Sequence, residues 1–374
     1  SKLGIELFVL DDGWFGERNN DDCSLGDWFV NEEKLKGGLN SLATDINKMG
    51  MQFGLWFEPE MISPKSKLYE EHPDWCIHID GRIRSEARKQ LILDLSRDEV
   101  CEAVIKMLTD VLKSAPISYV KWDMNRNMTE IGSTAWPAKK QKEIAHRYML
   151  GLYKILENIT SNFPNILFES CSGGGGRFDG GMLYYMPQTW TSDDTDAIER
   201  LMIQEGTSLV YPTSSMGSHV SAVPNHQVHR ITPLNTRGVV AMAGSFGYEL
   251  DVTKMNEEEK EEVKKQVEFY KNIRSTVQFG DLYRLKSSFD SNEVAWMNLS
   301  KDGKEVVVSY VKKYAEANVI PRRLKVKALD ENSLYEVIET GEVFGGDELM
   351  YIGLEIGELM GDYQAKNWTL RKVD

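Results

Sequence analysis

Five short apolar segments of this chain each run directly into acidic residues, and this repeat restricts the fold more than any other feature. The segments are Ile5–Leu10 before Asp11-Asp12, Gln52–Phe57 before Glu58-Pro59-Glu60, Ile117–Val120 before Lys121-Trp122-Asp123, Asn165–Phe168 before Glu169, and Thr189–Ser192 before Asp193-Asp194. Apolar runs of this length are typical of buried strands. Because a parallel barrel gathers its strand ends on one rim, we expect these acids to converge on one site.

Segments with helical periodicity separate the apolar runs. They are Leu35–Lys48, Arg97–Lys113, Ala138–Ser161, Asp196–Leu209 and Met255–Gln278. Ser96 is the expected N-cap of the second, because a serine hydroxyl can accept from the first free backbone amides. Strand followed by helix, repeated along the chain, predicts a parallel sheet with helices outside, and hence an α/β fold of the (β/α)8 TIM-barrel type.

The pattern changes after Gly280. Short, partly alternating runs now follow one another with Gly, Asp and Asn between them, and they are Tyr283–Leu285, Val294–Leu299, Glu305–Val311, Arg323–Val326 and Leu334–Val337. No long helical segment interrupts them. The sequence therefore predicts two domains, a catalytic barrel over residues 1–280 and a C-terminal antiparallel β-sandwich over residues 281–374.

Composition excludes several classes of protein. A net charge of −14 over 374 residues argues against a nucleic-acid partner, whose phosphates would be repelled. The sequence contains no long uncharged apolar run, so no transmembrane helix is expected. The four cysteines lie far apart and form no CxxC pair, so neither disulfides nor a zinc site are expected. Cysteines without disulfides favour a cytoplasmic location. A secreted form without its signal is the alternative.

Two carboxylates at these strand ends suit glycoside hydrolysis, in which one attacks the anomeric carbon while the other protonates the leaving oxygen and then activates water. Asp123 is the candidate nucleophile, and Lys121, on the same face of an extended segment, would favour its anion. Asp193 is the candidate acid/base, since Trp190 and Asp194 would raise its affinity for a proton. A structural ion pair between Lys121 and Asp123 is the alternative interpretation.

Other residues of these segments allow more than one interpretation. The Asp11-Asp12 pair suits Mg²⁺ or Ca²⁺, but it equally suits sugar hydroxyls, and the absence of a regular ligand spacing favours the sugar. Trp14, Trp56 and Trp190 offer flat faces for a sugar ring, although tryptophan is also a common core residue.

Three further motifs lead to weaker hypotheses. The Gly173–Gly176 run lacks both phosphate-loop patterns, so its glycines are expected to let backbone approach a ligand. His219, His226 and His229 have a spacing that suits a metal, but packing or capping roles are favoured. Cys171 has no cysteine-protease signature and is expected to be a small ligand-facing residue. No metal and no cofactor is predicted.

Taken together, the motifs resemble the α-galactosidases of glycoside hydrolase family 36. The resemblance covers nearly the whole chain, including the tail after residue 280, and rests on five ordered segments, which are Leu10–Gly16, Gly54–Met61, Lys121–Arg126, Glu169–Arg177 and Trp190–Asp196. It implies a retaining double displacement on terminal α-galactosides such as melibiose and raffinose, without a cofactor.

Carried over residue by residue, the resemblance makes Asp123 the nucleophile and Asp193 the acid/base. It implies that Asp11 and Asp12 hold the galactose hydroxyls at C4 and C6, and that Lys121 and Asn125 bind others, Asn125 near C2. The remaining residues implied to form the galactose pocket are Trp56, Arg88, Cys171, Gly174 and Trp190. A related α-glycosidase or galactosyl transferase using the same acids remains an alternative function, as does an inactive sugar-binding fragment.

The chain departs from the family pattern at its N-terminus. Family members usually carry a large β-sandwich and a first barrel strand ahead of the strand that ends at Asp11-Asp12, and only ten residues precede Asp11 here. The resemblance therefore implies the C-terminal portion of a longer enzyme, with a barrel incomplete at its start. Unpaired edges at Ile5–Leu10 and Phe246–Leu250 lead us to expect a homo-oligomer.

Overall fold

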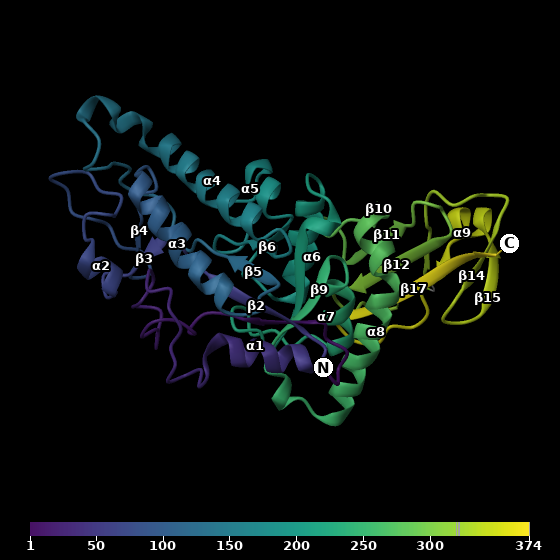
Figure 1. The fold of residues 1–374 in the computed structure, drawn as a ribbon. Helices are drawn as coiled ribbons and strands as arrows, with labels where there is room; N and C mark the ends of the chain where they lie inside the picture. Colours follow the sequence, from purple (N-terminus) through teal and green to yellow (C-terminus); the bar gives the residue numbers. More distant parts are fainter. Residues whose placement is uncertain (319, 321, 374) are drawn as a thin grey trace. The chain divides into compact units, whose positions relative to one another are not determined.

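A computed structural model describes residues 1–318, 320 and 322–373 of the chain (Figure 1). The chain divides into two compact units, Ser1–Thr189 and Trp190–Asp374, and each is described by itself. The boundary between them lies within the segment that the sequence predicts as the barrel. No helix within the described ranges is long and apolar enough to cross a membrane.

The first unit is built on a parallel sheet. Its strands, in spatial order, are β1 (Leu7–Leu10), β2 (Gln52–Phe57), β5 (Tyr119–Trp122), β6 (Leu167–Ser170) and the first two residues of β7 (Gln188–Trp190). Neighbouring strands pair in parallel, as predicted. Each of the apolar runs seen in the sequence contributes a strand, although β5 and β6 begin two residues later than their runs and extend into the polar residues that follow.

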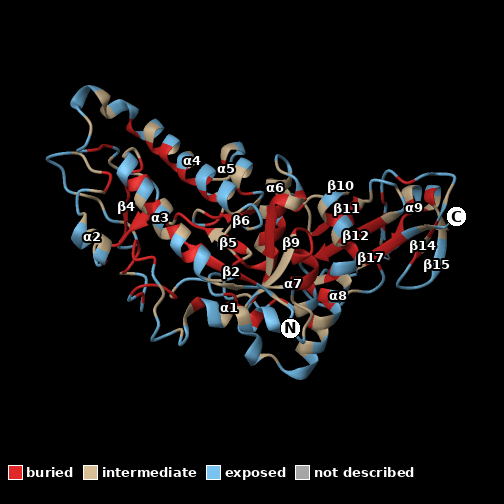
Figure 2. Ribbon diagram, viewed as in Figure 1, coloured by how far each residue is buried: buried red, intermediate tan, exposed pale blue. Residues whose placement is uncertain are grey.

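Helices follow the strands of this unit. They are α1 (Gly38–Lys48), α2 (Lys67–Glu71), α3 (Asp98–Ser114), the 3₁₀ turn η1 (Ala138–Glu143), α4 (Ile144–Asn162) and α5 (Gly180–Tyr185), with a small antiparallel pair of β3 (Met61–Ile62) and β4 (Leu91–Ile92). Helices α3 and α4 lie side by side (Figure 1). Figure 2 shows both striped, buried on one side and exposed on the other, as expected of helices that cover a core.

The expected N-cap of α3 is wrong by one residue. Arg97 occupies the cap position, with no side-chain cap hydrogen bond, whereas the Ser96 hydroxyl donates to Asp94 Oδ1 at 2.5 Å. The negative charges of Asp98 and Glu99, in the first turn, still stabilise the helix by interacting with the positive end of its dipole. Helix α4 likewise begins at Ile144, because the segment from Ala138 forms a 3₁₀ turn first.

The second unit begins with further strand and helix pairs. Its elements are the end of β7, α6 (Ala197–Ser208), η2 (Thr213–Ser215), β8 (Met216–Ser221), α7 (Leu234–Ala241), β9 (Ser245–Glu249), η3 (Val252–Lys254) and α8 (Glu257–Phe279). Strands β8 and β9 pair in parallel. Asp196 caps α6, and Asn256 with Glu259 forms a capping box on α8, which explains why these helices begin there.

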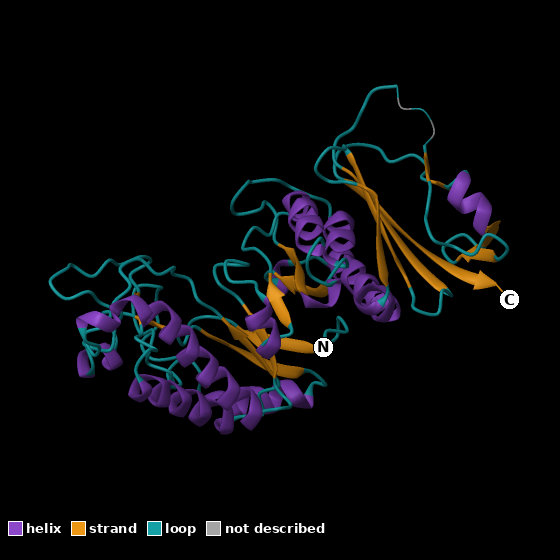
Figure 3. Cartoon of the chain, turned by 90° about the horizontal axis from the view of Figure 1, so that it is seen from above, coloured by secondary structure: helices purple, strands orange, loops and turns teal. Residues whose placement is uncertain are grey.

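The rest of this unit is an antiparallel β-domain. A six-stranded sheet runs in the order β10 (Asp281–Lys286), β11 (Glu293–Leu299), β12 (Glu305–Lys312), β17 (Gln364–Val373), β14 (Leu334–Val337) and β15 (Glu342–Gly345). A second pair, β13 (Arg323–Leu324) and β16 (Leu354–Glu355), and the helix α9 (Gly346–Tyr351) share its core. The sequence predicted β10 to β14 but missed β15, β16 and β17, of which β17 is the longest strand (Figure 3).

The strand and helix order up to residue 279 is that of a partial (β/α) barrel, followed in sequence by the antiparallel β-domain. Within the described residues, β1 and β9 stand at the ends of the strand order, each with one neighbour. Both edges were predicted from the sequence.

Candidate functional site

Asp123 follows β5 directly and is 6% exposed. Its carboxylate accepts three hydrogen bonds. The backbone N–H of Met124 donates to Oδ1 at 2.8 Å, while Asn125 Nδ2 and Trp56 Nε1 donate to Oδ2 at 2.8 and 3.2 Å. These donors come from two neighbouring strand ends, β2 and β5, so the parallel pairing of the strands fixes the orientation of the carboxylate.

The acidic pair after β1 is held by two cations. Lys121 Nζ donates to Asp11 Oδ2 at 3.1 Å. Arg18 grips Asp12 with two nitrogens, Nε at 3.0 Å from Oδ1 and Nη2 at 2.8 Å from Oδ2. Such a two-point contact fixes the plane of the carboxylate. The expectation that Lys121 acts on Asp123 stays a prediction, because the ion pair that the structure gives is with Asp11.

The tryptophans near these acids differ in their surroundings. Trp14 is a core residue that packs against Phe15, Trp28 and Phe57, and its Nε1 donates to the carbonyl oxygen of Trp56 at 2.9 Å. The interpretation of Trp14 as a core residue is therefore the correct one. Trp56 is also buried, but its ring nitrogen reaches Asp123, so this side chain belongs to the surroundings of the candidate nucleophile.

The loop after β6 brings Cys171 close to the same carboxylate and Gly173 close to Asn125. Cys171 is 1% exposed, and burial raises its pKa well above the usual range, with the nearby charge of Asp123 adding to the effect. A thiol held protonated is a poor nucleophile. Gly173 and Gly174 have φ angles of +52° and +81°, which favour glycine, and a Cβ at Gly173 would lie 3.9 Å from Asn125 Oδ1.

Arg88 lies in the loop before β4 and is exposed. It and Lys89 both have left-handed φ angles, +52° and +56°, which are uncommon for residues with a side chain. The Arg88 charge acts on Glu58, the first acid after β2. Two unusual backbone conformations in sequence, directly before the buried Gln90, mark this turn as a constrained element beside the acidic strand ends.

Asp193 and Trp190 belong to the second unit. Asp193 is exposed and lies three residues after the end of β7. The neighbouring backbone is fixed, since the N–H of Asp194 donates to Ser192 Oγ at 3.0 Å and Asp194 Oδ1 accepts from the N–H of Asp196 at 3.1 Å. Trp190 is buried, with the His219 ring 4.6 Å away and the Arg200 guanidinium 4.9 Å from its centroid.

Metal ligation has no structural support in the described ranges, which hold no group of three or more His, Cys, Asp or Glu side chains able to bind a cation. His219 Nδ1 lies 3.7 Å from Glu249 Oε2, and the His219 ring packs against Trp190 at an angle of 35° between the ring planes. The packing role favoured for this histidine therefore fits its contacts.

Two family models match the chain. The model described as Melibiase matches residues 1–280, and the model described as Glycosyl hydrolase family 36 C-terminal domain matches residues 293–370. The chain belongs to glycoside hydrolase family 36.

Relatives within family 36 are similar over the whole chain. Alpha-galactosidase AgaA of Geobacillus stearothermophilus is 61% identical over 373 residues, which covers 100% of this chain and 51% of AgaA. Alpha-galactosidase Mel36A of Lactobacillus acidophilus is 52% identical over 373 residues, covering 100% and 51%. The chain thus spans about half the length of these curated relatives.

Solved structures give the same result. The crystal structure of an AgaA variant in complex with raffinose has a TM-score of 0.98 at 61% identity, and covers 100% of this chain and 52% of that one. Another AgaA variant, in complex with stachyose, also has a TM-score of 0.98. The likeness confirms the predicted fold class, a partial barrel followed by an antiparallel β-domain.

Sequence reasoning about this family 36 chain left two buried acids without a role. Glu58 and Glu60 follow β2, and both are 0% exposed. Burial, helped by the charge of Asp123, raises the pKa of Glu58 to about 8. Burial acts on Glu60 in the same direction, but the Arg177 ion pair outweighs it, so the pKa of Glu60 is lowered. Both acids stand in the same motif at the end of an apolar run, but the residues that set their different pKa values lie far away in sequence.

Proposed function

We propose that this chain carries the catalytic residues of a retaining α-galactosidase that hydrolyses terminal α-galactosides of the melibiose and raffinose type. The observation that carries the proposal is the Asp123 carboxylate, buried at a strand end in a family 36 chain and held by three donors. A carboxylate that attacks the anomeric carbon reacts faster when its orientation is already fixed before the substrate binds.

The reaction has two displacements. In the first, an Asp123 oxygen attacks the anomeric carbon while Asp193 gives its proton to the glycosidic oxygen, so the leaving sugar departs as an alcohol and galactose is held as an ester. In the second, Asp193 takes a proton from water, and the water oxygen attacks the same carbon. The ester bond breaks, galactose leaves with its configuration retained, and both carboxyl groups return to their starting states.

Asp11 and Asp12 are proposed to hold the C4 and C6 hydroxyls of galactose. Their contacts with Lys121 and Arg18 support this role, because these cations keep acceptor oxygens in place for a ligand. Lys121 and Asn125 are proposed to bind further hydroxyls, Asn125 near C2. The other residues proposed to line the galactose pocket are Trp56, Arg88, Cys171, Gly174 and Trp190.

The Cys171 thiol supports Asp123 as the sole nucleophile. Because burial keeps the pKa of this thiol well above its usual range, the sulfur stays protonated beside the reacting carboxylate. The raffinose and stachyose in the solved relatives support oligosaccharides with a terminal galactose as the substrate class.

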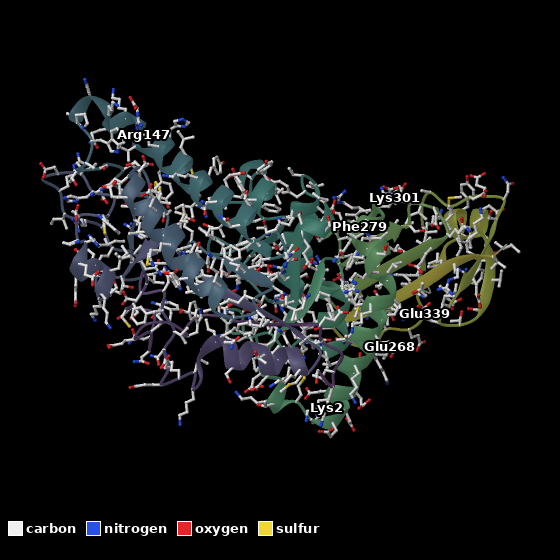
Figure 4. All side chains as sticks on the ribbon, in the orientation of Figure 1. Lys2, Arg147, Glu268, Phe279, Lys301 and Glu339 are labelled. Atoms are coloured by element: carbon white, nitrogen blue, oxygen red, sulfur yellow. The ribbon has the colours of Figure 1, made fainter. Side chains whose placement is uncertain are left out.

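We also propose residue 280 as the end of the catalytic domain. Figure 4 labels Phe279, the last residue of α8, and Lys301, which forms an ion pair with Asp281 at the start of β10. The two family models divide the chain on either side of this point, which supports the proposal.

Two substitutions test the mechanism. Asp123→Asn keeps the shape but cannot form the ester, so hydrolysis of an aryl α-galactoside should fall at least on the order of a thousandfold while galactose binding survives.

Asp193→Ala should spare substrates with good leaving groups, and added azide should restore part of the rate. Asp110→Asn, at an exposed aspartate of α3, is the matched control and should keep most activity. Substantial turnover by Asp123→Asn, or no azide rescue of Asp193→Ala, would contradict the assignments.

A further inference from the structure

Glu58 is linked to the candidate nucleophile through a single residue. Its Oε1 accepts the backbone N–H of Asn125 at 2.5 Å, and the side chain of Asn125 donates to Asp123 Oδ2 at 2.8 Å. Asn125 thus has its backbone on one carboxyl group and its side-chain amide on the other. A shift of Glu58 would move the Asn125 backbone and, with it, a hydrogen bond to Asp123.

The other oxygen of Glu58 faces Gln90. Gln90 is also fully buried, and its Nε2 donates to Glu58 Oε2 at 3.3 Å. Gln90 is held by the turn that contains the left-handed residues Arg88 and Lys89, and its backbone N–H donates to the Ala87 carbonyl at 3.0 Å. Each oxygen of Glu58 therefore accepts a hydrogen bond from an uncharged donor.

The largest effects of charge on Glu58 come from Asp123, in the loop after β5, and from Arg88, in the turn before β4. Burial and the negative charge of Asp123 both disfavour a second carboxylate here, and the Arg88 charge offsets them only in part. With its pKa raised to about 8, Glu58 is mostly uncharged at neutral pH.

The uncharged form has a specific advantage for the nucleophile. The Asn125 side chain lies close enough to both carboxyl groups to interact with each. A charged Glu58 would be a strong acceptor and would compete with Asp123 for this amide, whereas the uncharged acid is a weaker one. It would also place a second negative charge beside an aspartate that must attack carbon.

We propose that Glu58 is a positioning residue that, as the uncharged acid, holds Asn125 and thereby aims the Asp123 carboxylate. The inference rests on the proposed glycosidase function for its catalytic consequence, but the charge state of Glu58 is independent of it. Glu58 touches no reacting atom in this account, since it acts through Asn125 alone.

The first test measures the charge state without any substrate. An infrared spectrum at pH 7 should contain the carbonyl stretch of a protonated, buried carboxylic acid, and this band should be lost in Glu58→Gln. Glu60→Gln is the matched control, because Glu60 is equally buried but ionised, and the band should remain. If Glu60→Gln does not fold, Glu169→Gln, which changes another buried acid, replaces it. A band unaffected by Glu58→Gln would overturn the proposal.

The second test measures the consequence for catalysis. Glu58→Gln mimics the uncharged acid, so its kcat on an aryl α-galactoside should stay within about threefold of the parent, and the alkaline fall in kcat should move to higher pH. Glu58→Ala leaves Asn125 unsupported, and its kcat should fall on the order of 100-fold, with a smaller change in KM. A purely structural role would lower Tm in Glu58→Ala but leave kcat per folded molecule and the pH profile unchanged, which would overturn the proposal.

The two proposals fail in different ways. If the parent protein hydrolyses no α-galactoside, the proposed function fails, while the infrared band still decides the charge state of Glu58. Calorimetric binding of 1-deoxygalactonojirimycin, a ligand of one solved relative, then replaces kinetics. Affinity should fall in Glu58→Ala and be kept in Glu58→Gln, and equal affinities in the two variants would contradict the positioning role.

Discussion

Glu58 and Glu60 follow the same strand, but the residues around them favour different charge states, uncharged for Glu58 and charged for Glu60. Arg177 contacts both oxygens of Glu60, at 2.8 and 2.6 Å, and the Tyr148 hydroxyl and the Trp122 ring nitrogen add donors at 2.6 and 2.9 Å. Glu58 receives a backbone amide and a glutamine. Burial is equal in the two cases, so the partners decide which acid carries charge.

The comparison also separates two kinds of function. Charged Glu60 ties the end of β2 to the loop after β6 and is a structural link, because its oxygens are fully used by donors. Uncharged Glu58 faces the surroundings of Asp123. An ionisable residue with a raised pKa beside a candidate nucleophile is typical of functional sites, whereas a lowered pKa in a closed ion pair is typical of structural ones.

Breaking the Glu60 pair should have the largest effect. Arg177→Met leaves the Glu60 carboxylate buried without its cation, so the free energy of unfolding should fall by about 3–5 kcal/mol, measured by urea denaturation. Arg147→Met is the control. Arg147 of α4, labelled in Figure 4, pairs with Glu143 at the end of η1, where both side chains are more exposed, and its loss should cost about 1 kcal/mol or less. Equal losses would show that burial of the pair does not matter.

The pH dependence of stability should separate the two acids next. The folded-state pKa of Glu58 is raised from 4.5 to about 8, so its contribution is complete below pH 4.5 and is lost as pH rises toward 8. The free energy of unfolding should fall by about 1.4 kcal/mol per pH unit in this window. Glu60 has the opposite sign. Because its pKa is lowered from 4.5, its contribution is complete above pH 4.5 and is lost as pH falls from 4.5 through the lowered pKa.

Denaturation at a series of pH values measures this slope. Glu58→Gln cannot titrate, so the part of the slope between pH 4.5 and 8 that belongs to Glu58 should disappear from this variant. The slope should persist in a variant of an exposed acid such as Glu258→Gln. Parallel curves for the parent and for Glu58→Gln would mean that Glu58 is already ionised at neutral pH.

A third carboxylate, Asp12, should give the smallest change. Its Arg18 partner is buried while Asp12 itself is partly exposed, so Arg18→Met should lower stability by about 1 kcal/mol or less. If Asp12 holds a galactose hydroxyl, the same variant should raise KM for an α-galactoside about fivefold, because 1 kcal/mol corresponds to that factor in affinity. A loss of stability as large as that of Arg177→Met would show that exposure does not weaken such pairs.

The sequence predicted the elements that depend on local pattern. The apolar run before Asp123 became β5, and the acids at Asp11 and Asp12 lie where a strand ends. Local pattern was also enough to find the start of α6 within one residue, because Asp196 is a good cap. It failed for Ser96, whose hydroxyl bonds to Asp94 in the preceding loop, an interaction that competes with capping.

The charge states of the strand-end acids lay beyond sequence reasoning for a physical reason. Glu58 and Glu60 stand in the same short motif, and their different partners, Gln90 and Arg177, are 32 and 117 residues away. No periodicity encodes such contacts. Trp56 is a similar case, because a tryptophan within a strand gives no sign that its ring nitrogen will reach a carboxylate 67 residues later.

These separations have a consequence for how the molecule reaches its folded state. The parallel pairing of Trp56 with Lys121 closes a long stretch of chain, and the Glu60–Arg177 contact closes a longer one. Closing such loops costs entropy before any contact repays it, so folding of this kind is slow. The surroundings of Asp123 require β2, β5 and the loop after β6 at once. They are therefore expected to form late during synthesis, and a chain released before the loop after β6 is made would lack these contacts of Asp123.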